Sequence, residues 1–435
     1  MNPGSGMRVL FIHPNFPAQF RHLATVLGRD PANKVVFATR SERPEWAIPG
    51  VEKHLIGPGS AEDKRARTTH PFARGFEDAV RSGEDTARAL GELRNKGFIP
   101  DVVYGHSGWG ATMFLKDVFP DAAFLAYFEW FYRARGSDVD FDPAEPPTWQ
   151  TVASVRAKNA SILLDLESCD FGYSPTAWQR SQFPREFRHK IALIHDGIDT
   201  DYFRPASEGE PPLELAGIDL SGARELVTYA TRGMEPYRGF PQFMEAAALI
   251  LKQRPGCHIV VAGSDRVCYG KRLPEGQSHK QQALKRLDLD TSRLHFPGAL
   301  PYGQYKRLLQ TSNAHVYLTR PFVLSWSLLE SMSCGCLVVA SDTQPVREVI
   351  RHGVNGLLAP FFSPERIAET VVQALERKDD LRPLREKARA TIEGRFALRR
   401  LMPAHLNLLR AVLRGRLHPS AGPRPGAAAR NPASA

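Results

Sequence analysis

Residues 319–335, TRPFVLSWSLLESMSCG, decide the fold class of this chain. They follow an apolar run at 314–319 (AHVYLT) that is typical of a buried strand, and a turn at Pro321 leads into a helix that begins near Ser325 and Ser327. A strand, a loop and a helix N-terminus in this order aim free backbone N–H groups and the positive end of the helix dipole at one point. A diphosphate is an anion that such a point binds well.

Glu330 lies on the first turns of the same predicted helix. A carboxylate there can accept two hydrogen bonds from a vicinal diol such as that of a ribose. The stretch therefore predicts a nucleotide site.

Apolar strand-like runs alternate with helical patterns in both halves of the chain. In the first half the predicted strands are 8–13, 34–39, 101–106, 122–128, 171–174 and 190–195, and in the second half they are 225–231, 258–263, 294–297, 315–319 and 336–341. Continuously apolar strands between helices predict parallel sheets that are covered on both faces. We therefore predict an α/β protein with two Rossmann-like, doubly wound domains facing each other across a cleft.

A length of 435 residues is too great for one ordinary core, which supports two domains. The predicted divisions are a first domain at 1–205, a Pro-, Gly- and Glu-rich linker at 206–223, a second domain at 224–395, a C-terminal helix at 396–416 that can return to the first domain, and a disordered tail at 417–435. We also predict helices over residues 65–97 and 346–352.

Composition and charge limit the class of protein. No run approaches the roughly 20 apolar residues of a membrane span, and no apolar block follows basic residues at the N-terminus as in a signal peptide. We expect a cytoplasmic protein with five reduced cysteines. The net charge of +10 is concentrated at 64–74, 180–190 and 382–416, which are either solvated helix faces or a surface for peripheral contact with anionic lipid on the inner face of the membrane. The sequence has no nucleic-acid-binding signature, so we expect no nucleic acid partner.

Several candidate polar residues follow predicted strands. His106 ends a strand, Arg232 and Arg238 follow the first strand of the second half, and Glu330 follows a later one. Because ligands of open α/β sheets bind beyond the carboxyl ends of the strands, these side chains are expected on one rim of the cleft.

Five segments together resemble the retaining GT-B glycosyltransferases, the large family 4-like group that includes sucrose synthases and phosphatidylinositol mannosyltransferases. Smaller support comes from HSGW at 106–109. The segments are HDGIDTDYFRP at 195–205, TRGMEPYRG at 231–239, the turn at 294–301, LLESMSCGCLVVAS at 328–341 and VREVIRHGVNGLLAP at 346–360.

This resemblance implies a GT-B fold and transfer of a sugar from a nucleoside diphosphate donor to an acceptor hydroxyl, with retention of configuration and without a metal or other cofactor. The acceptor would be a glycan or a lipid-linked molecule. Two guanidiniums suit a leaving diphosphate because they are permanently charged.

The resemblance also assigns roles to single residues. Arg232 and Arg238 would stabilise the leaving diphosphate, and His106 would lie against the transferring sugar. Glu330 would hold the ribose hydroxyls. Backbone groups would bind the rest of the donor, with Ser325, Trp326 and Ser327 at the diphosphate and Gly298, Ala299 and Leu300 at the base.

Two features depart from the family pattern. Phe322 stands where the family has the first of two Glu eight residues apart, a residue that contacts the donor sugar in relatives. The Gly-Gly pair of the first strand–helix loop is replaced by residues 15–19 (NFPAQ), so the acceptor side must be built differently, with Gln19, Arg21 and Glu129 as the candidates.

Other interpretations stay open at this point. Asp138-x-Asp140-x-Asp142 lacks the Gly and the later Glu of a calcium loop, so we predict no metal site. An epimerase or hydrolase of the same architecture would need an acidic residue across the cleft from Glu330, and Glu129 is the candidate. A non-catalytic scaffold that binds a nucleotide sugar is the third interpretation, which Phe322 suggests.

Overall fold

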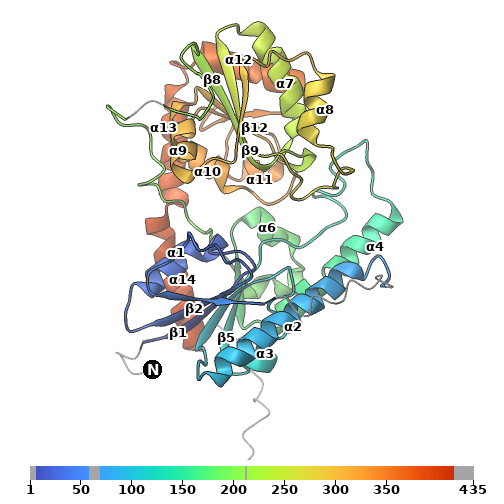
Figure 1. The fold of residues 1–435 in the computed structure, drawn as a ribbon, viewed down its shortest axis with the longest axis vertical. Coiled ribbons are helices and arrows are strands. Elements are labelled where there is room, and N and C mark those ends of the chain that lie inside the picture. Colours follow the sequence, from blue (N-terminus) through green and yellow to red (C-terminus); the bar gives the residue numbers. More distant parts are fainter. Residues whose placement is uncertain (1–5, 58–68, 211–212, 416–435) are drawn as a thin grey trace, which may run out of the picture.

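Two parallel β-sheets, one in each half of the chain, form the frame of the protein (Figure 1). The structure is a computed structural model, and it describes residues 6–57, 69–210 and 213–415. The predicted disordered tail at 417–435 lies outside these residues.

The first sheet has the strand order β3-β2-β1-β4-β5-β6-β7. Its strands are β1 (Arg8–Ile12), β2 (Lys34–Thr39), β3 (Val51–Leu55), β4 (Val102–His106), β5 (Ala123–Tyr127), β6 (Phe171–Ser174) and β7 (Ile191–Leu193). Central strands such as β4 are buried along their whole length, whereas β3 at the edge is largely accessible. All neighbouring strands are parallel, as continuous apolar runs predict.

The second sheet has the strand order β10-β9-β8-β11-β12-β13 and is also parallel throughout. Its strands are β8 (Glu225–Gly233), β9 (Cys257–Ser264), β10 (Leu294–Gly298), β11 (Ala314–Tyr317), β12 (Val338–Ser341) and β13 (Leu357–Ala359). In each sheet the strand order reverses between the first strand and its later neighbour, that is, between β1 and β4 and between β8 and β11. Ligands of such sheets bind beyond the carboxyl ends of the strands near this point, where Arg238 follows β8 and Glu330 follows β11.

Helices cover both faces of the first sheet. One face packs on α1 (Arg21–Gly28), whose Leu23, Ala24 and Leu27 are buried as their spacing predicts. The elements between the strands are η1 (Ala18–Phe20), α2 (Arg74–Asn95), α3 (Leu115–Val118), α4 (Trp149–Lys158), α5 (Ala160–Ser168), α6 (Ala177–Gln182) and η2 (Arg185–Lys190). Residues of α2, α3 and α5 pack on the other face.

The second sheet is covered by α7 and α12 on one face and by α10 and α13 on the other. The elements of this domain are η3 (Pro236–Arg238), α7 (Phe240–Gln253), α8 (His279–Arg286), α9 (Tyr302–Thr311), α10 (Trp326–Ser333), α11 (Gln344–Arg347), α12 (Pro364–Glu376) and α13 (Arg382–Arg395). Ser363 caps α12 and Pro364 occupies its first turn, where its missing N–H costs no hydrogen bond.

The C-terminal helix α14 (Leu398–Leu413) leaves the second domain and packs on the first, where Met402, Leu408, Leu409 and Val412 join the core around β1 (Figure 1). It begins beside Ile198, on the stretch that follows β7. Ile198 N–H donates to Phe396 O and Leu398 N–H donates to Ile198 O, both at 2.8 Å. The two crossings between domains therefore lie side by side.

Some elements differ from the sequence-based predictions. Helix α2 begins at Arg74, whereas the prediction began at residue 65. Residues 65–68 lie outside the described chain. The helix predicted at 346–352 is the shorter α11, which begins two residues earlier with Pro345 in its first turn. Strand β7 covers Ile191–Leu193 of the predicted 190–195. Lys190 ends a 3-10 helix, and residues 194 and 195 follow the strand.

Candidate functional site

A cleft of about 2750 Å³ lies between the two domains and is lined by both. From the second domain, Arg232, Arg238, Ser325, Trp326 and Glu330 line it, together with Ser327, Ala299 and Leu300. From the first domain, Gln19, Arg21 and Glu129 line it. Residues predicted for the site from distant segments therefore share one space.

Arg238 is held rigidly at the wall of this cleft. It is buried, and its Nη1 donates to Thr319 Oγ1 at 2.8 Å, to Val323 O at 2.9 Å and to the Tyr317 hydroxyl at 3.3 Å. Gly239 turns the chain into α7 with φ of 64°, a conformation that favours glycine. A Cβ at this position would also lie only 2.6 Å from the Cβ of Leu318. A side chain fixed in this way needs little reorganisation to bind an anion.

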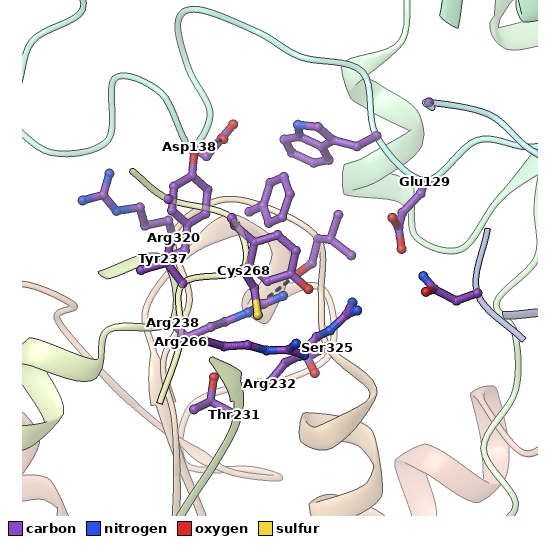
Figure 2. Close-up of a pocket in the computed structure, with 18 of the residues that line it drawn as sticks. Glu129, Asp138, Thr231, Arg232, Tyr237, Arg238, Arg266, Cys268, Arg320 and Ser325 are labelled. Atoms are coloured by element: carbon purple, nitrogen blue, oxygen red, sulfur yellow. Dashed lines mark hydrogen bonds between the residues drawn. The ribbon is translucent and has the colours of Figure 1, made fainter. Parts of the chain in front are cut away.

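Arg232 is exposed and has no hydrogen-bond or ion-pair partner among the residues that the structure describes. Figure 2 shows it beside Arg266, with both guanidiniums pointing into the space next to Ser325. Arg266 precedes residues 268–270, whose backbone N–H groups all donate to the buried carboxylate of Glu235. Glu235 thus fixes the loop that carries a third cation into the cleft.

The N-terminus of α10 contributes less than predicted. Ser325 N–H donates to the Tyr317 hydroxyl at 2.9 Å, and Ser325 Oγ caps the helix by accepting from Ser327 N–H at 3.3 Å. Within the described chain, Trp326 N–H keeps no such partner. The predicted set of three free amides is therefore reduced to one, because the helix cap satisfies Ser327 N–H and the end of β11 satisfies Ser325 N–H.

Glu330 is almost completely buried, and tyrosine hydroxyls donate to both of its oxygens. Tyr302 donates to Oε1 at 2.7 Å and Tyr305 donates to Oε2 at 3.0 Å. Burial raises the pKa of Glu330, although these two hydrogen bonds and the charge of Arg21 oppose the shift. Each oxygen keeps one lone pair for a further donor.

Phe322 belongs to an aromatic cluster that joins the domains. Its ring lies 4.9 Å from that of Trp130 in the first domain and 5.4 and 5.3 Å from those of Tyr237 and Tyr269 in the second. The Tyr237 hydroxyl in turn donates to Asp138 Oδ2 at 2.8 Å. At the position of the family's first Glu, this chain therefore has an apolar wall.

On the first-domain side, Gln19 and Glu129 are in contact, because Gln19 Nε2 donates to Glu129 Oε1 at 2.9 Å. His106 Nε2 lies 3.5 Å from Glu129 Oε2. Burial alone would raise the pKa of Glu129, but the neighbouring His106, the hydrogen bond from Gln19 and the charge of Arg232 outweigh it and lower the pKa below its usual value. Glu129 is therefore ionised at neutral pH.

His106 lies beneath the surface of the cleft, and its predicted contact with the transferring sugar stays a prediction. The ring is 2% exposed and stacks under the indole of Trp109, with centroids 4.2 Å apart, and it is not among the residues that line the cleft. Trp109, which is 44% exposed, takes the surface position instead.

Two other predicted residues lie elsewhere than expected. The guanidinium of Arg21, an acceptor-side candidate, lies between the rings of Trp46 and Tyr302, at 5.2 and 5.5 Å, and so approaches the Glu330 end of the cleft. Gly298 ends β10 with φ of 76° and does not line the cleft, whereas Ala299 and Leu300 do.

Asp196 was not singled out from the sequence. Its Oδ2 accepts from Trp326 Nε1 at 2.9 Å and from the Tyr127 hydroxyl at 3.2 Å, so it links α10 to the first sheet. Burial, reinforced by the charge of Glu129, raises its pKa to about 7. Its position in the HDGID segment at 195–199, one of the motifs shared with the family, could have indicated it as a site residue.

Tyr302 and Tyr305 were also missed. Their spacing of three residues places them on one face of a helix directly after the turn predicted to bind the base, and that pattern could have indicated them.

Two facing Rossmann-like domains with a shared cleft and a C-terminal helix that returns to the first domain define the GT-B architecture, which confirms the predicted fold class. Two family models match the chain: "Glycosyl transferase family 4 group" over residues 31–203 and "Glycosyl transferases group 1" over residues 220–391. The chain belongs to this glycosyltransferase family, as the sequence motifs indicated.

Curated relatives match only part of this chain, at low sequence identity. The D-inositol 3-phosphate glycosyltransferase of Frankia alni is 26% identical over 194 residues, which cover 43% of this chain and 44% of that protein. The alpha-D-kanosaminyltransferase of Streptomyces kanamyceticus is 23% identical over 223 residues, covering 51% and 53%. The chain thus matches about half the length of these relatives.

Solved structures share the fold over nearly the whole chain. Anabaena HepE in complex with UDP-glucose superimposes with a TM-score of 0.66 at 15% identity, covering 93% of this chain and all of that one. The sucrose-phosphate synthase of Thermosynechococcus elongatus gives 0.70 at 16% identity, covering 94% and all of that chain. None of the helices in the described ranges has the length and apolar character needed to cross a bilayer.

Proposed function

We propose that this protein transfers a sugar from a nucleoside diphosphate sugar to an acceptor hydroxyl, with retention of configuration and without a metal. The observation that carries the proposal is the convergence of Arg232, Arg238 and Glu330, from three separate segments, on one interdomain cleft. The crystallised relative HepE binds UDP-glucose, which supports a donor of this class.

The charges suit the chemistry of a leaving diphosphate. Negative charge grows on the phosphate oxygens as the bond to the anomeric carbon breaks, and Arg232, Arg238 and Arg266 supply permanent positive charge in the same region (Figure 2). Glu330, oriented by its two tyrosines, would accept the ribose hydroxyls through its remaining lone pairs.

A turnover assay with several donors tests the proposal. UDP-, GDP-, ADP- and dTDP-linked hexoses are incubated with the purified protein, and release of nucleoside diphosphate is measured for the wild type, Glu330→Ala and Arg238→Ala. We expect release from one class of donor, and a large loss in both variants. Release that neither substitution changes would overturn the site assignment. Tight nucleotide binding without release would favour the scaffold interpretation.

We further propose that the acceptor is a glycan or a lipid-linked molecule and that the first domain contacts anionic membrane. In the basic segment 180–190, Arg180, Arg188 and Lys190 donate to backbone carbonyls of their own domain, which leaves Arg185 exposed. Better support comes from a shallow groove along α4. It is lined by Arg135, Pro147, Trp149, Val152, Ala153, Arg156 and Ala157.

A further inference from the structure

Arg21 is a cation of the cleft that the proposed diphosphate site does not use. It is the first residue of α1 in the first domain, whereas Arg232, Arg238 and Arg266 come from the second domain. Among the residues that the structure describes, its guanidinium has no hydrogen-bond or ion-pair partner. A partly buried guanidinium with five N–H donors is suited to a ligand that offers several acceptor oxygens.

Two aromatic rings, one from each domain, fix the place of this guanidinium. The Cζ atom of Arg21 lies 5.2 Å from the ring centroid of Trp46 and 5.5 Å from that of Tyr302. Tyr302 is itself held in place, because its ring stacks on that of Tyr202 at 5.8 Å and its hydroxyl donates to Glu330. Contact with the face of a ring orients a guanidinium and leaves its N–H groups free to donate.

Arg21 lies close enough to Glu330 for their charges to interact. The positive charge of Arg21 is one of the causes that oppose the rise in the pKa of Glu330. Both side chains line the cleft, and within the described chain they form no hydrogen bond or ion pair with each other. A ligand group that binds at this end of the cleft can therefore contact both.

The opposite hydrogen-bonding characters of these two side chains define the group that fits between them. An ionised carboxylate only accepts hydrogen bonds, and a guanidinium only donates them. A hydroxyl group does both, because its O–H can donate to Glu330 while its oxygen accepts from Arg21. A phosphate would be repelled by the carboxylate, and an amine would be repelled by the guanidinium. A vicinal diol therefore suits this pair best.

We propose that Arg21 is a donor-binding residue, which donates hydrogen bonds to the ribose hydroxyl oxygens while Glu330 accepts hydrogen bonds from the same hydroxyl groups. This role rests on the proposed function, which places a ribose at Glu330. It differs from the acceptor-side role that the sequence suggested for Arg21. Because Arg21 and Glu330 belong to different domains, the nucleotide is held by both walls of the cleft.

A cycle that combines one protein variant with one change in the ligand tests this role. Dissociation constants of UDP, GDP, ADP and their 2′,3′-dideoxy analogues are measured by isothermal titration calorimetry for the wild type and Arg21→Ala. For the ribonucleotide that the wild type binds most tightly, we expect Arg21→Ala to weaken binding about 10- to 100-fold, because a hydrogen bond to a charged group has an effect of that size. The dideoxy analogue lacks both hydroxyls, so the same substitution should weaken its binding less than about threefold.

Two further variants separate the hydrogen bonds of Arg21 from its charge. Arg21→Lys keeps the positive charge but loses the planar fork, so it should weaken the ribonucleotide at least about fivefold and leave the dideoxy analogue within about twofold of the wild type. Arg43→Ala is the matched control and should change neither affinity. Arg43 is an exposed arginine of the first domain that also lines the cleft, and its side chain has no hydrogen-bond or ion-pair partner in the described part of the chain. Thermal melting of the ligand-free proteins verifies that each variant is folded.

Three results would overturn the role. Equal weakening of the ribonucleotide and its dideoxy analogue by Arg21→Ala would mean that Arg21 attracts the diphosphate or only bridges the domains. Ribonucleotide binding that Arg21→Ala leaves unchanged would exclude the contact and leave the proposed function intact. No binding of any nucleoside diphosphate to the wild type would remove the proposed function together with this role.

Discussion

The hydroxyl of Tyr302 lies 2.7 Å from Oε1 of Glu330, and this hydrogen bond joins the first turn of α9 to the first turns of α10. With Tyr305 on the other oxygen, it leaves the buried carboxylate a single orientation. The lone pairs that remain are the ones available to a diol.

Tyr305→Phe is expected to weaken donor binding. Hydrogen bonds to a charged group contribute about 1.5–3 kcal/mol, so the loss should lower donor affinity roughly 10- to 100-fold while the rate at saturation changes little. KM and kcat measured separately check this split. Tyr202→Phe is the control, since Tyr202 stacks on Tyr302 but its hydroxyl donates to nothing within the described chain. An unchanged KM in Tyr305→Phe would contradict the prediction.

Arg232→Ala is expected to lower kcat/KM for the donor by about 100- to 1000-fold, because removal of one donor at a developing anion has an effect of that size. Stability should change by less than about 0.5 kcal/mol, since the side chain is exposed and makes no hydrogen bond or ion pair among the described residues. Steady-state kinetics and thermal melting check both parts. Arg286→Ala, which breaks an exposed ion pair with Glu245 outside the cleft, should leave kinetics unchanged.

The sequence predicts the central strands well and the periphery poorly, for physical reasons. Strand β4 is buried on both faces and reads as an apolar run, whereas β3 (VEKHL) lies at an edge and has no such run. Helix α4 has no buried residue, so its sequence lacks an apolar face to detect.

The site shows the same division. Arg238 and Glu330 stand in local motifs, and their positions in the cleft could be predicted from strand order. The cover that Trp109 provides over His106 depends on the path of one loop, and the contact of Gln19 with Glu129 joins segments that nothing in the local sequence connects. Such contacts arise only from the tertiary fold.

The loop at 128–148 bridges the domains, and Tyr237→Phe is expected to loosen it. The Tyr237 hydroxyl donates to buried Asp138, and Phe141 packs against Phe361 and Phe362. Loss of the hydroxyl leaves a buried carboxylate with one donor fewer, which should cost about 1–3 kcal/mol of stability.

A double-mutant cycle with Asp138→Asn measures the coupling of this pair, and small-angle scattering of the ligand-free protein measures the separation of the domains. We expect a favourable coupling energy and a larger radius of gyration in Tyr237→Phe. Additive effects with an unchanged radius would show that this contact does not hold the domains together.

The groove along α4 predicts salt-sensitive binding to anionic vesicles. Trp149 is 70% exposed, and the neighbouring Arg135 and Arg156 are exposed without carboxylate partners in the described chain. Because each basic residue near an anionic surface contributes about 1 kcal/mol, Arg135→Glu combined with Arg156→Glu should weaken co-sedimentation with phosphatidylglycerol vesicles at least tenfold. Arg382→Glu, on the second domain, is the control. Binding that ignores both salt and these substitutions would exclude the surface.

Asp196 predicts a dependence of stability on pH. Burial raises its pKa from 3.8 to about 7, so between these values the folded state keeps a proton that the unfolded state has lost. The folded state binds more protons in that window, and its stability therefore falls as the pH rises from about 4 to 7 and is constant above it.

Asp196→Asn removes this titration, while the amide oxygen can still accept from Trp326 and Tyr127. The stability of the variant relative to wild type should therefore increase by about 2–3 kcal/mol between pH 5 and pH 8, measured by urea denaturation. A difference that stays constant across this range would mean that Asp196 is ionised throughout, and that the carboxylate beside the N-terminus of α10 is charged when the donor binds.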